Sequence, residues 1–191
     1  MSVQTVYEYS VNTNFSEFVV NSDYLKSEIQ QSSITTTLDY ITIFGDACKI
    51  IFSDALSAND NTTLDNVVAT HTPKLKAAKT NKFDQIDSKT NSLINNGFTF
   101  ASKTFSLSLA GQSTLLGLDL LRNDIALTYP IYYNSIDYND VLEITDSITV
   151  HNMVLTAVGT YRAHKDSGTA LKDQVRAATT VAGVEGIVDN R

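Results

Sequence analysis

The chain has 191 residues, of which 42% are hydrophobic and 18% charged, and its formal net charge at pH 7 is -7. This length permits one domain or two small ones, and the composition is typical of a globular protein rather than a disordered one. The sequence has no long basic run, so electrostatic capture of nucleic acid or of an anionic membrane is disfavoured.

The cysteine content and the apolar runs bear on the compartment. The single cysteine, Cys48, excludes an internal disulfide, and its apolar surroundings in ACKIIFS predict a buried, unreactive thiol. The opening residues lack the basic patch and apolar region of a signal peptide. No apolar run approaches the roughly 18 residues needed to cross a bilayer. We therefore expect a protein that is made in a cytoplasm and stays soluble.

Residues 1–73 predict an N-terminal module with a small sheet. Runs rich in β-branched and aromatic residues predict strands near Val3–Val11 and Phe15–Val20. Farther on, ITTTLDYITIF and ACKIIFS flank Gly45–Asp46, which predicts a hairpin.

Two helices complete this module. The first is expected in DYLKSEIQQS, with Ser22 as its N-cap. Ser57, followed three residues later by Asp60, predicts the start of the second helix, which Pro73 should end. Residues 74–82 are basic and lack bulky apolar residues after Leu75, so we expect a connector and the domain boundary there.

Residues 83–191 predict a second α+β domain with the order helix, hairpin, helix, hairpin, helix, helix. The first helix should end at Asn96–Gly97, and its short apolar stripe favours core packing over a coiled coil. Alternating Phe and Leu around ASK predict the first hairpin, and Ser108 should cap a helix that runs to about Asn123. The segments TYPIYYNS and NDVLEIT predict the second hairpin.

The last part of this domain predicts two long helices. Asp146 or Ser147 should cap the first, and Ser167–Gly168 should break it before the second begins. The predicted fold class is therefore α+β, with two small domains in which short strands and hairpins pack with helices.

Metal chemistry has little support in this sequence. His71 and His164 close apolar stripes of predicted helices, where a packed core histidine is the simpler interpretation, and His151 lies beside its stripe. The acidic series at every third position suggests calcium, but the glycine of an EF-hand loop is missing. We expect a turn, a strand and a helix cap to separate these carboxylates, which are Asp137, Asp140, Glu143 and Asp146.

Signatures of catalysis are also missing from the sequence. It contains no G-x-S-x-G, no P-loop and no G-x-G-x-x-G. We therefore expect no enzyme and no cofactor, although a glycan hydrolase that uses the acidic series is a less favoured alternative.

Four tyrosines gather around the second predicted hairpin. Aromatic faces stack on sugars or anchor protein interfaces, although β-sheets also favour tyrosine without any such role. These residues are the candidate surface for a partner protein or a glycan: Tyr129, Tyr132, Tyr133 and Tyr138.

The stretch FDQIDSKTNSLINNGFTFASKTFSLSLAGQSTLLGL resembles a family of uncharacterised domains in tail-fibre and related virion proteins of tailed bacteriophages. Its first helix matches the pattern I-x-x-K/R-T-x-x-L-I at Ile86, Lys89, Thr90, Leu93 and Ile94. The following G-F-x-F/Y and F-x-x-S-x-x-x-Q patterns match at Gly97, Phe98, Phe100, Phe105, Ser108 and Gln112. The ending, with I-x-D-x-R, is also similar, so the resemblance covers residues 83–191. Residues 1–73 are more loosely similar to modules fused to phage structural proteins.

The resemblance implies a non-enzymatic virion component that assembles with other virion proteins, as a homo-oligomer with a trimer favoured. A short tail fibre, a tail adaptor or a head decoration protein fits the chain length. A carbohydrate-binding module that uses the tyrosines, with a host glycan as its partner, is the alternative. We expect the protein to be made in the host cytoplasm and located in the virion, without nucleic acid or membrane as a partner.

Overall fold

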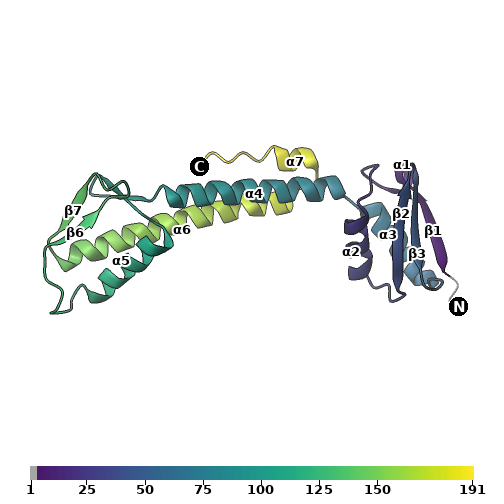
Figure 1. Ribbon diagram of the computed structural model, residues 1–191. Coiled ribbons are helices and arrows are strands. Elements are labelled where there is room, and N and C mark those ends of the chain that lie inside the picture. Colours follow the sequence, from purple (N-terminus) through teal and green to yellow (C-terminus); the bar gives the residue numbers. More distant parts are fainter. Residues whose placement is uncertain (1–3) are drawn as a thin grey trace. The chain divides into compact units, whose positions relative to one another are not determined.

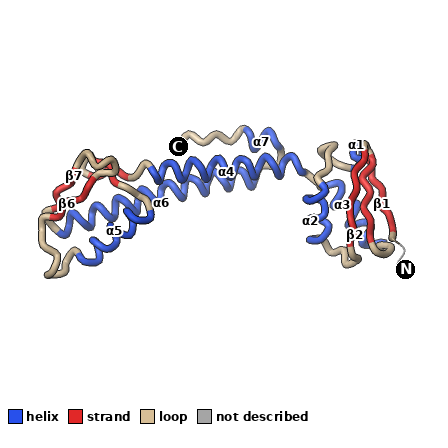
Figure 2. Tube along the Cα trace, in the orientation of Figure 1, coloured by secondary structure: helices blue, strands red, loops and turns tan. Residues whose placement is uncertain are grey.

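The computed structural model describes residues 4–191 and divides into two compact units, one up to Lys79 and the other from Thr80 to Arg191. Each unit has its own hydrophobic core. Both combine short antiparallel strands with helices, which confirms the α+β class (Figures 1 and 2). The division falls inside residues 74–82, where the sequence placed the boundary.

The first unit is a three-stranded antiparallel sheet with helices on one face (Figure 1). Its strands are β1 (Thr5–Ser10), β2 (Leu38–Phe44) and β3 (Ala47–Phe52), in the order β1-β3-β2, and the covering helices are α2 (Ser22–Gln31) and α3 (Ala58–Thr70). The antiparallel pairing of β2 with β3 confirms the predicted hairpin. Gly45 adopts the left-handed conformation in its turn, at φ +57°. Cys48 is fully buried under the helices, as expected, and burial raises the pKa of its thiol to about 11.

The strand expected at Phe15–Val20 is wrong. β1 leads directly into the short helix α1 (Val11–Asn14). The Phe15 side chain that follows is buried in the core, with 1% of its surface exposed. Only Val3 of the predicted first strand lies outside the described residues. The side chain of Asn21, not Ser22, caps α2 by accepting from the amides of Asp23 and Tyr24. Ser57 caps α3 as predicted.

The predicted end of the second helix and the connector after it need correction. α3 ends at Thr70, and Pro73 begins helix α4 (Pro73–Asn95), which contains all of residues 74–82. Proline suits the first turn of a helix because its missing N–H would have no partner there. The Glu17 carboxylate accepts from the amides of Lys74 and Leu75 at 2.6 and 3.1 Å, so it caps this helix start.

His71 is the buried link between α3 and α4. Its Nδ1 lies 2.6 Å from the Glu28 carboxylate, and its Nε2 accepts from the Asn21 amide at 3.1 Å. The His71 ring also packs edge-to-face with the Phe15 ring, with 5.8 Å between the ring centroids. These contacts satisfy both ring nitrogens, which confirms the interpretation of a packed core histidine.

In the second unit, α4 packs along the long helix α6 (Ser147–Ala177), and the two hairpins and α5 gather near the start of α6 (Figure 1). The predicted hairpins are present as β4 (Phe98–Phe100) with β5 (Lys103–Phe105), and as β6 (Ile131–Asn134) with β7 (Val141–Ile144). Helix α5 (Leu109–Leu121) follows the first hairpin and is capped by Ser108. Asp146 caps α6 through the amide of Thr149. Phenylalanines of the first hairpin share a core with Leu115, Ile144 and Met153.

The predicted break at Ser167–Gly168 is also wrong, because α6 continues through it to Ala177 and only the short α7 (Val181–Glu185) follows. Gly168 is buried against α4: a Cβ added there would lie 2.7 Å from the Thr90 Oγ1 and 3.0 Å from the Arg191 Nη1. The glycine therefore serves a close helix contact rather than a helix end.

Arg191 closes this contact. Its guanidinium donates to the Thr90 hydroxyl at 3.0 Å and to the carbonyl oxygens of His164 and Ile86, both at 3.3 Å. The guanidinium also donates two hydrogen bonds to the Asp189 carboxylate, at 2.8 and 2.6 Å. These hydrogen bonds lower the pKa of Asp189. The segment after α7 is thereby held on both long helices.

We expect Gly168→Ala to lower the free energy of unfolding by about 1–3 kcal/mol, because the new methyl group overpacks the contact with Thr90. Gly159→Ala is the matched control in the same helix. Its Cβ would meet nothing within 4 Å, so the better helix propensity of alanine should stabilise by up to about 1 kcal/mol. Urea unfolding of both variants measures the two effects, and equal shifts of the same sign would contradict the role of Gly168.

Candidate functional site

The structure brings three of the four predicted tyrosines to one groove in the second unit. Tyr132, Tyr133 and Tyr138 line it, whereas Tyr129 does not. Tyr129 packs against the core and donates its hydroxyl to the Arg122 carbonyl at 2.9 Å, so its role is structural.

The groove lies between the β6–β7 hairpin and the start of α5 and has a volume of about 400 Å³. None of the described residues that line it carries a charge. Besides the tyrosines, they are Ser106, Ser108, Ala110, Gly111, Thr114, Asn134, Ser135 and Ile136.

Successive side chains of β6 point to opposite faces of the strand. Tyr133 is half-buried and packs its ring against Phe105 at 5.6 Å, and burial raises the pKa of its phenol. Tyr132 and Asn134 point to the opposite face of the strand, and the Tyr132 side chain is 64% exposed. The groove therefore has one anchored tyrosine and one accessible tyrosine from the same strand.

The β6–β7 turn presents the third tyrosine. Tyr138 is 80% exposed and adopts a left-handed backbone conformation, at φ +58°. For a tyrosine this conformation costs roughly 1–2 kcal/mol, so the surrounding turn has to impose it. The Tyr138 amide donates to the Ser135 carbonyl at 3.1 Å.

Asp137 organises this turn. Its carboxylate accepts from the Ser135 hydroxyl at 2.5 Å and from the side-chain and backbone amides of Asn139, at 2.9 and 3.2 Å. These hydrogen bonds, that of Ser135 first, lower the pKa of Asp137. Because the pKa of Asp137 is lower in the folded protein, its ionised carboxylate stabilises the turn at pH values above the ordinary pKa. This stabilisation is lost as the pH falls through the lowered pKa of the folded state.

The opposite wall begins where β5 leads into α5. The Ser106 hydroxyl donates to the Ser108 Oγ at 2.9 Å, and the same Oγ accepts from the Gly111 amide at 3.2 Å as the helix cap. The Asn134 carboxamide, across the groove, makes no hydrogen bond within residues 4–191. The groove thus offers aromatic faces, hydroxyls and an amide.

The structure places the acidic series in several different settings. Asp137 holds the turn, Asp140 pairs with Lys103 at 2.5 Å, Glu143 is exposed on β7 and Asp146 caps α6. This is the separation expected from the sequence. Over residues 4–191, no group of three or more His, Cys, Asp or Glu side chains is arranged to hold a metal ion. His151 instead lies 3.2 Å from Asp119 and is half-exposed.

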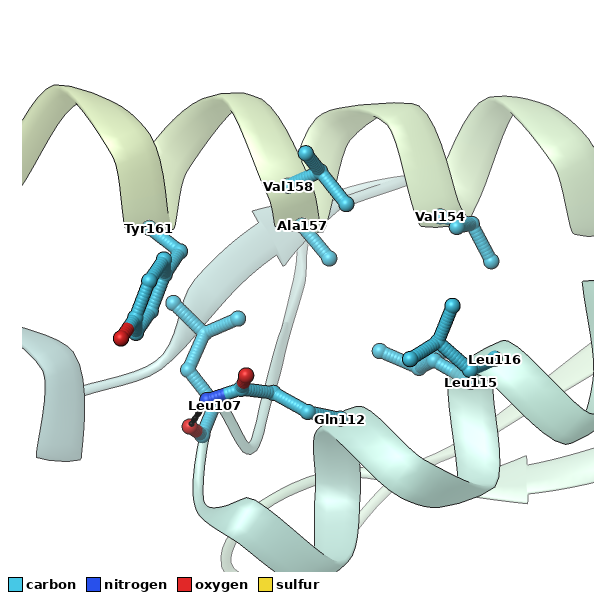
Figure 3. Close-up of a pocket in the computed structure, with 8 residues that line it drawn as sticks. All are labelled: Leu107, Gln112, Leu115, Leu116, Val154, Ala157, Val158 and Tyr161. Carbon is cyan, nitrogen blue, oxygen red and sulfur yellow. Dashed lines mark hydrogen bonds between the residues drawn. The ribbon is translucent and has the colours of Figure 1, made fainter.

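A second feature lies on another side of α5. Side chains of α5 and α6 converge on an apolar hollow of about 100 Å³ between the two helices (Figure 3). Its lining consists of Leu107, Gln112, Leu115, Leu116, Val154, Ala157, Val158 and Tyr161. Large apolar side chains of these two helices remain exposed at Leu109, Leu116, Leu120, Ile148, Leu155 and Val158, and of these Leu116 and Val158 line the hollow. We call these six residues the apolar face.

The sequence predicts the tyrosines as a candidate surface but not the polar wall or the apolar face. From sequence alone, Ser108 predicts only a helix cap, and the leucine-rich run predicts a helix without separating its two sides. The signal in the sequence is the spacing of Leu109, Leu116 and Leu120, which recur on one side of the helix while Leu115 faces the core.

Comparison with known proteins adds no further assignment. No family model, curated protein or solved structure matches the chain. Within residues 4–191, none of the helices combines the length and the apolar character needed to cross a bilayer.

We expect Ser135→Ala to raise the pKa of Asp137 toward its ordinary value of 3.8, because the hydroxyl is the strongest stabiliser of this carboxylate. An NMR titration of the side-chain carboxyl groups measures the change. Asp146 is the internal control, since Thr149 lowers its pKa and its midpoint should not move. An unchanged Asp137 midpoint would show that Ser135 does not hold the turn.

Proposed function

We propose that this protein is a structural component of a tailed-bacteriophage virion that acts by protein–protein assembly, as a short tail fibre, a tail adaptor or a head decoration protein. The sequence resemblance of residues 83–191 suggests the virion. The observation that carries the assembly role is the apolar face on α5 and α6.

The apolar face is unusually accessible for residues of this kind. Its six side chains are between 55% and 85% exposed, with Leu120 and Leu109 the most accessible. Large contiguous apolar patches are rare on monomeric soluble proteins and mark interaction sites. Burial of such side chains gains roughly 25 cal/mol for each Å² removed from water, which favours a partner that covers them.

The apolar face draws on both helices, which meet at the hollow. Leu116 of α5 and Val158 of α6 line the same hollow, and Asp119 contacts His151 farther along the pair. Leu109, Leu116 and Leu120 lie seven and four residues apart, and Ile148, Leu155 and Val158 lie seven and three apart. Spacings of three, four and seven are typical of helices that pack against helices.

Self-association through this face is the proposed mode of assembly, and a trimer is favoured. The chain carries a net charge of -7, yet none of the six side chains of the face is charged, so contact between these side chains brings no like charges together. The proposal assigns no catalytic role to the protein.

We expect the full chain to form one species of three copies, each of 20.9 kDa, in size-exclusion chromatography with light scattering. Leu116→Asp combined with Leu155→Asp should yield monomers, because two buried carboxylates would oppose the interface. Phe44→Asp is the matched control, since Phe44 is 90% exposed in the first unit, and it should leave the assembly intact. A monomeric wild type, or a trimer in the double variant, would refute this mode of assembly.

Mass spectrometry of purified particles from the virus that encodes the chain tests the virion role. Hundreds of copies in each particle would indicate head decoration, and a handful would indicate a tail or connector position. Absence of the protein from intact particles would defeat the virion proposal, whatever its oligomeric state.

A further inference from the structure

We propose that the groove between the β6–β7 hairpin and the start of α5 binds an uncharged saccharide. This goes beyond assembly, because it assigns a ligand class to a second surface of the protein. The inference rests on three properties of the groove: accessible aromatic faces, hydroxyl and amide partners, and an uncharged lining with carboxylates nearby.

Accessible aromatic rings supply the apolar part of the site. Tyr132 and Tyr138 line the groove from the strand and from the turn, and 64% and 80% of their surfaces are exposed. The C–H face of a pyranose ring is apolar and stacks on an aromatic face, while the ring hydroxyls stay free for hydrogen bonds. Tyr138 adopts its left-handed conformation in the turn, and its side chain is exposed there rather than packed in the core.

Both walls supply polar groups, Ser108 from the wall that faces the tyrosines and Asn134 from β6 itself. The Ser108 Oγ already accepts from Ser106 and from the Gly111 amide, so its own hydrogen remains available to a ligand. The Asn134 carboxamide offers both a donor and an acceptor and has no partner within residues 4–191. Neutral groups that both donate and accept match the hydroxyls of a sugar.

Charge selects among saccharides. None of the described lining residues is charged, and the carboxylates of Asp137 and Asp140 belong to the turn that contributes Tyr138. Lys103 does not supply a free positive charge there, because it is paired with Asp140 at 2.5 Å. Phosphates, uronates and sialylated glycans would find no cation among the described lining residues and would approach the Asp137 carboxylate, so a neutral sugar is preferred.

The groove is separate from the apolar face. It meets α5 at Ala110, Gly111 and Thr114, whereas the hollow beside the apolar face meets α5 at Gln112, Leu115 and Leu116. Different sides of one helix therefore serve the two surfaces. An assembly that covers the apolar face does not require the groove to be filled, so each proposal can fail without the other.

The test uses the full chain, labelled with ¹⁵N, and purified hexasaccharides as probes. Maltohexaose, cellohexaose and chitohexaose form the neutral panel, and hexagalacturonate is the acidic probe. We expect at least one neutral probe to shift the amide signals of Asn134, Ser108 and Tyr138 in a saturable manner. Hexagalacturonate should bind at least tenfold more weakly.

Variants locate the site. Tyr132→Ala or Tyr138→Ala should weaken binding of the neutral probe about fivefold, and the double variant at least tenfold. Tyr132→Phe should retain binding, because the ring face is preserved. Tyr40→Ala is the matched control, since Tyr40 is 48% exposed on β2 in the first unit, and it should bind like the wild type.

Three results would overturn the proposal. These are no binding of any neutral hexasaccharide, unchanged binding by the folded double variant, and equal or tighter binding of hexagalacturonate. The oligomeric state of each variant, measured in parallel, separates a failure of this site from a failure of assembly.

Discussion

The second unit depends on the close contact between Gly168 of α6 and Thr90 of α4. A glycine lets the backbone of one helix approach the side chain of the other, but this approach buries the threonine hydroxyl. The hydroxyl is satisfied because it donates to the Ile86 carbonyl at 2.8 Å and accepts from Arg191. One guanidinium thus joins both helices and the segment after α7, and Asp189 balances its charge.

This helix pair gives the candidate sites a firm base. The start of α6 shares a core with the first hairpin and with α5, so the two hairpins and α5 are fixed against a long helix rather than against each other alone. α5 then presents different sides to the groove and to the apolar face. The turn that carries Tyr138 is held in the same way, by a buried serine and a carboxylate rather than by its own residue preferences.

Local chemistry made much of the fold predictable. The caps at Ser57, Ser108 and Asp146, the hairpins and the buried His71 all follow from residue type and spacing. The errors arise where a distant segment decides. Gly168 alone predicts a helix break, but in the structure it allows close contact with Thr90 of another helix. Pro73 alone predicts a helix end, but in the structure it begins a new helix that Glu17 caps. For the same reason the tyrosines could be named from sequence, whereas the serines facing them could not, because the facing wall is made by tertiary packing.

The burial of Cys48 has a practical consequence for labelling chemistry. Cys48 has no exposed surface, and burial raises the pKa of its thiol to about 11, so the thiol is both inaccessible and protonated at neutral pH. A second cysteine introduced at an open position, such as Gly117 or Gly159, would therefore react selectively with maleimides. A fluorophore or spin label could be attached to either α5 or α6 with the native cysteine left in place.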